Sequence, residues 1–447
     1  MRPACTRSAP RSSRRWIPGG SRSGGSWVRS MLVIEGRAFR DGRIEPAAIG
    51  VEDGRIVAIK KQLRGDPVYR YSEAVILPGG VDVHVHLRDP GLTQKDDFFS
   101  GTESAAAGGV TTVVDMPNTV PPVTDGERLR DKLRTVSRNA NVDFGLYGGP
   151  TNAVDVESSR GATAFKTYLA ESTNAPAVRD DATLAGILLS VAQADSFLAA
   201  HCEDPAAFRP GAAKGLEDHH RLRPIEAEVA AVQRVARLRG AARVHIAHVT
   251  TAGAARARPP GATCEATPHH LLLSTASSLG ARGKVNPPLR PEGDRDALWR
   301  ELLAGGIDMF ASDHAPHTLE EKSQAFDAAP AGVPGVATTF PVLFRYVRRQ
   351  LLPLDRFVAM FSGNPARLLR ANKGEIAIGR DADLLVVDPR RVEKVTARRC
   401  RYKCGWTPFE GAEATFPTAT FVRGALVAQE GELVTERTGR MITASQP

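Results

Sequence analysis

Apolar runs alternate with longer amphipathic stretches through the middle of the chain. Eight runs have the length and composition of buried strands, and they cover residues 81–89, 110–118, 142–149, 163–170, 196–204, 243–251, 262–270 and 306–314. Stretches with helical spacing of apolar residues lie between most of them, for example 125–139, 180–194 and 224–240. A strand followed by a helix, repeated in this way, predicts an α/β fold of the (β/α)8 TIM-barrel type.

Short alternating strands occupy both ends of the chain. They fill residues 31–77, where Asp53-Gly54 is typical of a β-hairpin turn, and they return over 375–436. We therefore predict a small β-sandwich domain built from both ends. The predicted limits are a disordered basic tail at 1–30, the two parts of the β domain at 31–77 and 371–440, and the barrel at 78–370.

The positive charge of the chain is concentrated near its start. The formal charge is +9, but residues 1–30 carry seven arginines and no acid, which leaves about +2 for the rest. This distribution places the basicity in a tail and argues against a nucleic-acid-binding face. The tail lacks the apolar stretch of a secretory signal, although its Arg/Ser-rich composition also suits a transit peptide. We expect the working protein to begin near Met31.

Cysteine usage and hydropathy indicate the compartment. The chain contains five scattered cysteines, an odd number that argues against a disulfide framework and for a reducing cytoplasm. The pair Cys400 and Cys404 is too small a set to predict a zinc site. No apolar run is long enough for a membrane span, so we predict a cytoplasmic protein without membrane or nucleic-acid partners.

Ionisable residues gather at the C-terminal halves of the predicted strands, which form the active-site face of such a barrel. In VDVHVHLRD, the two-residue period puts His84 and His86 on one side, with Arg88 next in phase. Two neighbouring histidines facing a barrel axis would be costly unless a metal binds them. The alternative is a pair of surface histidines on an edge strand.

Further strands carry residues of the same chemical kind. They contribute Lys166, His201, the pair His245 and His248, and the SDHAPH segment with Asp313, His314 and His317. A buried lysine avoids its charge by a shifted pKa or by modification. This set exceeds the four ligands of one structural zinc and fits two neighbouring metals. Such a pair would lower the pKa of a bridging water, which predicts hydrolysis at an amide carbon or its reverse.

Ordered motifs from about residue 31 to 436 resemble the amidohydrolase superfamily, and within it the dihydroorotase family. They are DVHVHLRDPG (82–91), AAAGGVTTVVDMPNT (105–119), FKTY (165–168), HCED (201–204), HIAHVTT (245–251), KVNPPLR (284–290), SDHAPH (312–317), GRDADLLVVDP (379–389) and KCGWTPFEG (403–411). The resemblance implies two Zn²⁺ or similar divalent ions. It implies that His84, His86 and Asp313 bind one ion, that His201 and His248 bind the other, and that a carboxylated Lys166 bridges both.

The same resemblance implies a substrate and a reaction. N-carbamoyl-L-aspartate would close reversibly to (S)-dihydroorotate, a step of pyrimidine synthesis. Asp313 would act as the general base, Arg88 would grip the ring carboxylate, and Asn118, Asn286 and His317 would assist it. The glycine-rich loop 332–339 would contact the ring. A homodimer and an association with aspartate transcarbamoylase are also expected, whereas His245, His270 and His314 receive no site role.

Two other functions stay open at this stage. Allantoinase or dihydropyrimidinase would share the metal site, and a substrate without a carboxylate would have little need of Arg88. An inactive homologue that scaffolds aspartate transcarbamoylase is a function of another class, but such a protein usually lacks ligands that are all present here.

Overall fold

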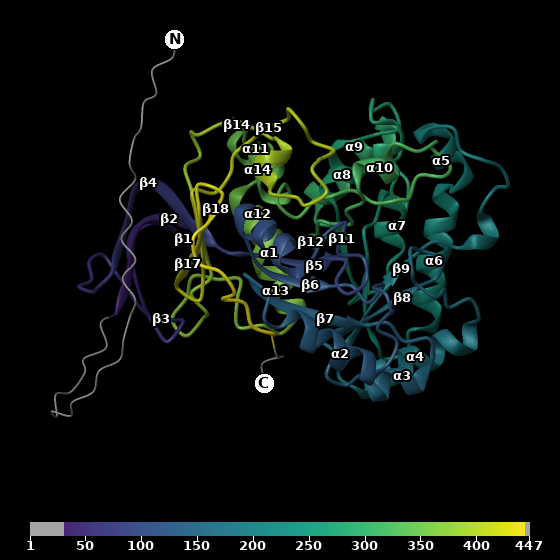
Figure 1. The fold of residues 1–447 in the computed structure, drawn as a ribbon, viewed down its shortest axis with the longest axis horizontal. Coiled ribbons are helices and arrows are strands. Elements are labelled where there is room, and N and C mark those ends of the chain that lie inside the picture. Colours follow the sequence, from purple (N-terminus) through teal and green to yellow (C-terminus); the bar gives the residue numbers. More distant parts are fainter. Residues whose placement is uncertain (1–30, 443–447) are drawn as a thin grey trace, which may run out of the picture. The chain divides into compact units, whose positions relative to one another are not determined.

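Eight parallel strands form the central sheet of this computed structural model, which describes residues 31–442 (Figure 1). Strands that are neighbours in the sheet are also consecutive in the chain, in the order β12, β11, β10, β9, β8, β7, β6, β5. A parallel bridge between Val85 and His314 joins the first strand region to the last, so the sheet closes into the predicted barrel. Its strands are β5 (Gly80–Val85), β6 (Val110–Asp115), β7 (Asp143–Gly148), β8 (Ala164–Tyr168), β9 (Phe197–His201), β10 (Arg243–Ile246), β11 (Thr263–Ala266) and β12 (Met309–Phe310).

Helices follow the strands as the amphipathic pattern predicts. Aspartate side chains cap α1, α2 and α4, since Asp97, Asp125 and Asp180 accept backbone N–H bonds of the first turn. The helices are α1 (Phe98–Ala107), α2 (Gly126–Val136), α3 (Ala153–Ser158), α4 (Asp181–Gln193), η1 (Pro205–Ala207), α5 (Leu216–Leu222), α6 (Ile225–Leu238), α7 (Ala252–Ala257), α8 (Pro268–Leu272), η2 (Gly280–Gly283), α9 (Glu292–Ala304), α10 (Leu319–Lys322), α11 (Thr339–Arg348), α12 (Leu354–Val358), η3 (Ala359–Gly363), α13 (Asn364–Leu368) and α14 (Ala397–Cys400).

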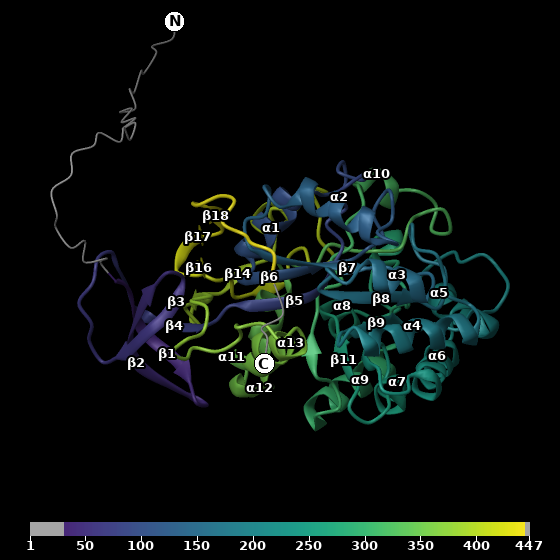
Figure 2. The same cartoon turned by 90° about the horizontal axis from the view of Figure 1, so that it is seen from below.

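A second sheet joins the two ends of the described chain, as predicted. Its order is β18, β17, β16, β13, β4, β1, β2, β3, and Figure 2 shows its purple and yellow strands side by side. The strands are β1 (Leu32–Arg40), β2 (Arg43–Glu52), β3 (Arg55–Lys60), β4 (Val68–Pro78), β13 (Leu384–Val387), β16 (Ala419–Val422), β17 (Ala425–Gln429) and β18 (Glu432–Leu433), and a separate ribbon pairs β14 (Glu393–Lys394) with β15 (Glu413–Ala414). The predicted hairpin turn has positive φ at Asp53 and Gly54.

Buried charges and a short terminal segment hold this sheet against the barrel. Lys373 donates to Asp143, at the start of β7, at 2.7 Å and to Asp383, just before β13, at 2.5 Å. The segment 437–442 then runs beside β7, where the Arg440 carbonyl accepts from the Phe144 N–H at 3.0 Å. The described residues 31–442 accordingly lie in one compact unit. Within the described residues, no helix is both long and apolar enough to cross a membrane.

The first barrel strand departs from the predicted alternation. Its pairing with β6 shifts register between Asp82 and Val85. Val81 and Val83 consequently pack in the small apolar cluster that holds Ala164 and Ala199, whereas Val85 joins the large helix-side cluster. A bulge inserts one residue and reverses the faces beyond it, so the single uninterrupted phase assumed for residues 81–89 is wrong.

Candidate active site

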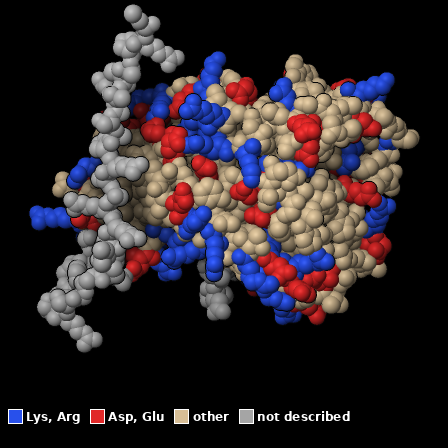
Figure 3. Space-filling view, viewed as in Figure 1, with Lys and Arg blue, Asp and Glu red and all other residues tan. Residues whose placement is uncertain are grey.

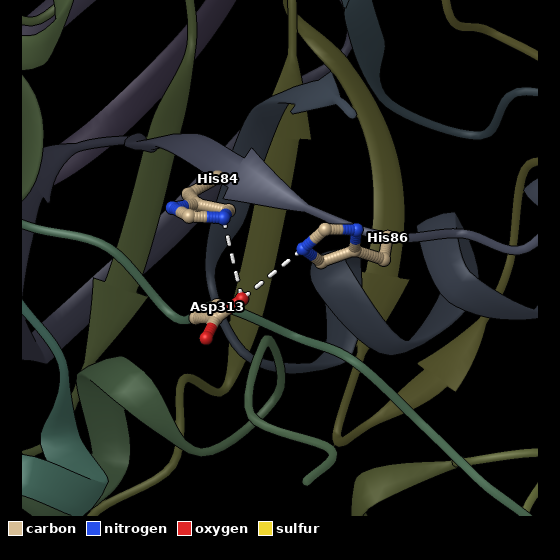
Figure 4. A group of neighbouring side chains, drawn as sticks. All are labelled: His84, His86 and Asp313. Atoms are coloured by element: carbon tan, nitrogen blue, oxygen red, sulfur yellow. Dashed lines mark hydrogen bonds and ion pairs between the residues drawn. The ribbon is translucent and has the colours of Figure 1, made fainter. Parts of the chain in front are cut away.

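Two histidines and one aspartate meet at the C-terminal end of the barrel (Figure 4). The Nε2 atoms of His84 and His86 each lie 3.2 Å from Oδ1 of Asp313. His84 belongs to β5, His86 follows it, and Asp313 follows β12. All three are buried, and their donor atoms lie close enough together to hold one metal ion.

The far side of each imidazole is held by an acceptor. Nδ1 of His84 lies 2.5 Å from Oε1 of Glu265, and Nδ1 of His86 lies 2.6 Å from Oδ1 of Asn118. An acceptor at Nδ1 favours the tautomer that carries its proton there. The Nε2 lone pairs of both rings are then directed at a carboxylate oxygen. A divalent cation held between these three atoms would offset the repulsion among their lone pairs.

A second pair of histidines lies beside the first group. Nδ1 of His201 is 3.0 Å from Nε2 of His248, and the His84 and His248 ring centroids are 5.2 Å apart. Nε2 of His201 is 2.9 Å from Glu203, whose carboxylate also accepts from Arg223 at 3.0 Å. One nitrogen of His201 is thus fixed by protein, and the other faces His248.

Lys166 is buried between these groups and has no hydrogen-bond partner among the described residues. Burial lowers the pKa of Lys166 to about 8, against the attraction of Glu265 and Asp313. An amine that is partly neutral near pH 8 is nucleophilic. The position and the missing partner therefore suit a lysine that is modified or that contributes to a metal bridge.

Burial and local charge also set the protonation of the first group. Burial alone would raise the pKa of Asp313, but His84 and His86 outweigh it and hold that pKa below its ordinary value. Burial lowers the pKa of His86 to about 4, although Asp313 opposes the shift. An ionised carboxylate beside a neutral imidazole is the protonation state that metal ligation requires.

Arg88 lies at the wall of the same pocket and is only 3% exposed. Its Nε donates to the Pro316 carbonyl at 3.1 Å, and its Nη2 lies 3.2 Å from Nε2 of His317. The strand ends at Val85 and Arg88 has a φ of +64°. The prediction that Arg88 shares a strand face with His84 is therefore wrong, because a left-handed turn rather than strand phase brings it to the pocket.

The three other predicted substrate residues have different surroundings. Asn118 accepts from His86 and donates to the Thr173 carbonyl at 2.8 Å, while Asn286 lies 2.9 Å from His219. Both asparagines line the pocket. His317 is fully buried behind Arg88 and is not among the lining residues. The structure therefore brings Asn118 and Asn286 to the pocket and places His317 one layer behind it.

These side chains surround one small cavity of about 40 Å³. Its lining combines both histidine groups, Arg88 and parts of three loops, with Tyr168, Ser172, Thr173, Ala315, Ala331 and Gly332 as further members. Gly332 has a φ of +136°, and a Cβ there would lie 2.5 Å from the Ala315 carbonyl. The predicted loop 332–339 thus reaches the pocket through this glycine.

The three histidines without an assigned role are occupied by protein partners. His245 lies 2.8 Å from Thr263 and 2.9 Å from Glu265, and His314 lies 2.7 Å from Asp96. His270 lies 3.0 Å from the Pro287 carbonyl. These contacts leave none of the three rings directed at the pocket.

Similarity to known proteins identifies the family of this chain. The amidohydrolase family matches residues 75–427. A dihydroorotase of Methanosarcina acetivorans is 38% identical over 431 residues, covering 89% of this chain and 91% of its own. A dihydroorotase of Halobacterium salinarum is 40% identical over 425 residues, covering 92% and 100%. The chain belongs to the dihydroorotase branch of the amidohydrolase family.

Solved structures of amidohydrolases share the fold. The L-hydantoinase (dihydropyrimidinase) of Arthrobacter aurescens matches with a TM-score of 0.86 at 29% identity, covering 93% of this chain and 100% of its own. The dihydropyrimidinase of Brevibacillus agri matches with a TM-score of 0.83 at 27% identity, covering 93% and 100%. The chain is thus a cyclic amide hydrolase by family, and its scaffold is common to both branches.

The donor set fits the metals that the amidohydrolase family implies. Both histidine groups present converging ring nitrogens, and the orphaned amine of Lys166 lies buried among them. Buried polar atoms are rarely left in this state without a ligand.

Sequence analysis assigns no role to Glu203 or Glu265, although both orient candidate ligands. Glu203 follows His201 in HCED, and Glu265 is a lone carboxylate in an apolar strand. A lone ionisable residue in an apolar strand is the signal that could have found Glu265, because the same signal singled out Lys166. Its partner His84 is 181 residues away, and no local pattern reveals such a pair.

Proposed function

We propose that this protein is a dihydroorotase, which interconverts N-carbamoyl-L-aspartate and (S)-dihydroorotate in pyrimidine synthesis. Hydrolysis adds the hydroxyl of water to the ring carbonyl carbon, breaks its bond to the ring nitrogen, and transfers the remaining proton to that nitrogen. The observation that carries the proposal is Arg88, a buried guanidinium at the wall of the pocket beside His86 and Asp313. A buried cation facing a polar pocket suits an acidic substrate.

Two divalent ions, zinc by preference, complete the proposed site. His84, His86 and Asp313 would hold one ion, His201 and His248 the other, and a carboxylated Lys166 would bridge them. The ions would lower the pKa of a water and polarise the carbonyl that it attacks. The proposal is supported by the convergence of Nε2 atoms on Asp313 and by the missing partner of the Lys166 amine.

Proton transfer and substrate binding would be carried out by different side chains of the pocket. Asp313 would receive the proton of the attacking water and return it to the leaving nitrogen, because its carboxylate lines the pocket beside both histidines. Arg88 and Asn286 would bind the ring carboxylate and ring amide. His317 would steady Arg88 from behind, and Asn118 would orient His86 while its amide borders the substrate.

A second candidate function is that of the structural neighbours, hydrolysis of a neutral ring such as a hydantoin or dihydropyrimidine. The shared scaffold favours it, but a neutral ring would leave the buried charge of Arg88 without a partner. An inactive scaffold protein is supported less, because five of the six candidate ligands predicted from the sequence line the pocket and the sixth, Lys166, lines the adjoining cavity.

The test is a substrate panel on purified, zinc-loaded protein. We expect hydrolysis of dihydroorotate, which is monitored as the loss of its ultraviolet absorbance. We expect little turnover of allantoin, hydantoin or dihydrouracil at equal concentration. Preference for dihydrouracil or hydantoin would replace the proposal with the second function. A zinc-loaded protein that hydrolyses none of the four would support the scaffold function.

A further inference from the structure

One buried carboxylate contacts both halves of the candidate metal site. Glu265 lies on β11 and its side chain is almost completely buried. Its Oε1 lies 2.5 Å from Nδ1 of His84 and accepts the backbone N–H of His248 at 3.1 Å. Its Oε2 lies 2.9 Å from Nε2 of His245. One side chain thereby joins a histidine of the first group to the backbone of a histidine of the second.

The contact with His248 has a conformational consequence. His248 has a φ of +35°, a left-handed conformation that is unfavourable for a residue with a Cβ. Its N–H would lose a hydrogen bond in this turn if Glu265 did not accept it. The same conformation turns the ring so that Nε2 lies 3.0 Å from His201. Glu265 therefore stabilises the backbone geometry that directs His248 at its partner.

The contact with His84 has an electronic consequence. A carboxylate at Nδ1 fixes the proton there, leaves the Nε2 lone pair toward Asp313, and makes the imidazole a better donor. His84 and Glu265 are both about 1% exposed, so water does not compete for this hydrogen bond.

We infer that Glu265 is a positioning residue that couples the two metal positions, so that its carboxylate sets the affinity for both ions at once. This inference rests on the proposed metal-dependent function. His86 and His201 have their own partners, Asn118 and Glu203, and each of those contacts one histidine of the site. Glu265 alone among these three contacts both histidine groups.

Glu265→Gln tests the inference, because glutamine keeps the size of the side chain but removes its charge and one acceptor. The measurement is zinc affinity by competition with a chelator, together with zinc stoichiometry by mass spectrometry. We expect both ions to bind about 10- to 100-fold more weakly, since that is the usual effect of losing such an orienting partner. Loss at one position only, or unchanged affinity, would overturn the inference.

A matched control separates positioning from general damage. Glu228 is likewise buried, pairs with Arg290 and accepts from the Thr250 N–H at 2.7 Å, only two residues beyond His248. Glu228→Gln makes the same substitution at a buried glutamate outside the histidine groups. We expect it to lower stability and leave zinc affinity unchanged. Equal loss of zinc affinity in both variants would overturn a specific role for Glu265.

A spectroscopic measurement needs no metal and no activity. In the metal-free wild type labelled with ¹⁵N-histidine, we expect Nδ1 of His84 to carry a proton with a strongly downfield signal. This signal should disappear in Glu265→Gln, or in Glu265→Asp if the glutamine variant does not fold. An unprotonated Nδ1 in the wild type would contradict the inference. A wild type that binds no zinc would instead refute the proposed function.

Discussion

Arg88 combines burial, a left-handed backbone and a place at the pocket wall. Its guanidinium is held by the Pro316 carbonyl and by His317, but no carboxylate of the described residues forms a salt bridge with it. A substrate carboxylate would supply the missing negative charge. At the residue scale, we therefore propose that this side chain, more than the histidines, sets the choice of substrate.

Arg88→Ala should lower kcat/KM for dihydroorotate by about 10- to 100-fold, the value of one charge-assisted hydrogen bond or slightly more. Zinc content should stay at the wild-type level, because no candidate metal ligand is altered. Arg209→Ala is the matched control, since this exposed arginine lines only the neighbouring outer pocket. Steady-state kinetics decide the matter, and unchanged kcat/KM in Arg88→Ala would refute the carboxylate contact.

His219 should make the metal-free protein sensitive to acid. Burial, with help from Arg223, lowers the pKa of His219 to about 4. Between that value and the ordinary 6.5 the unfolded chain binds the extra proton, so stability falls as pH falls through this window. The full effect is about 3 kcal/mol. His219→Gln should reduce the drop in melting temperature between pH 7 and pH 5, and an identical drop would contradict this assignment.

Sequence reasoning found the residues with unusual chemistry but not the contacts that orient them. His84, His86, Lys166 and Asp313 were recognisable because ionisable groups are rare in apolar strands. Glu203, Glu265 and the buried position of His317 depend on how distant segments pack, and no local spacing encodes that packing.

At the scale of elements, the terminal segment 437–442 holds the second sheet against the barrel, and Arg423, between β16 and β17, donates to its Thr438 carbonyl. The Phe144 N–H donates to Arg440 at 3.0 Å, the Ile442 N–H donates to Phe144 at 2.7 Å, and the Arg440 N–H donates to Asp143 at 2.8 Å. The predicted limit at 440 would cut through this segment.

Truncation after Glu436 should therefore lower the melting temperature by about 5 °C, since each lost hydrogen bond contributes about 1 kcal/mol. Calorimetry of the metal-free protein measures the change. Truncation after Ile442 is the control and should leave the melting temperature at its full-length value, because it keeps every contact named above. Equal melting temperatures for both truncations would contradict the stabilising role.

The elements themselves were predictable, and their ends were less so. All eight barrel strands lie inside the predicted runs or extend beyond them by one residue, because apolar β-branched runs mark buried strands. The predicted runs continue too far, since site residues follow the strands in loops that look similar in sequence. The bulge in β5 was not predictable, because period-two alternation gives no sign of an inserted residue.

At the scale of the whole molecule, Lys and Arg are interspersed with Asp and Glu over the face shown in Figure 3. This agrees with the small net charge predicted for the chain beyond residue 30. The barrel and the two-ended sheet followed from the pattern of strands, and the family comparison supports both.

A chain that begins at Met31 should keep dihydroorotate hydrolysis and zinc content, because every candidate site residue lies in the compact unit 31–447. The comparison is kcat/KM of this shortened protein against that of the full chain, measured at equal zinc occupancy. A loss of activity with zinc retained would show that residues 1–30 contribute to the site. The predictions made for that segment lie outside the described residues.

The central claim is that two metal positions in one pocket perform the hydrolysis of dihydroorotate. Its most direct test is a titration of zinc into chelator-treated, metal-free protein, with dihydroorotate turnover measured at each addition. The account predicts no turnover without metal and a rise that saturates at two equivalents per chain. Full turnover in the metal-free protein, or a turnover rate that does not change as zinc is added, would contradict this claim.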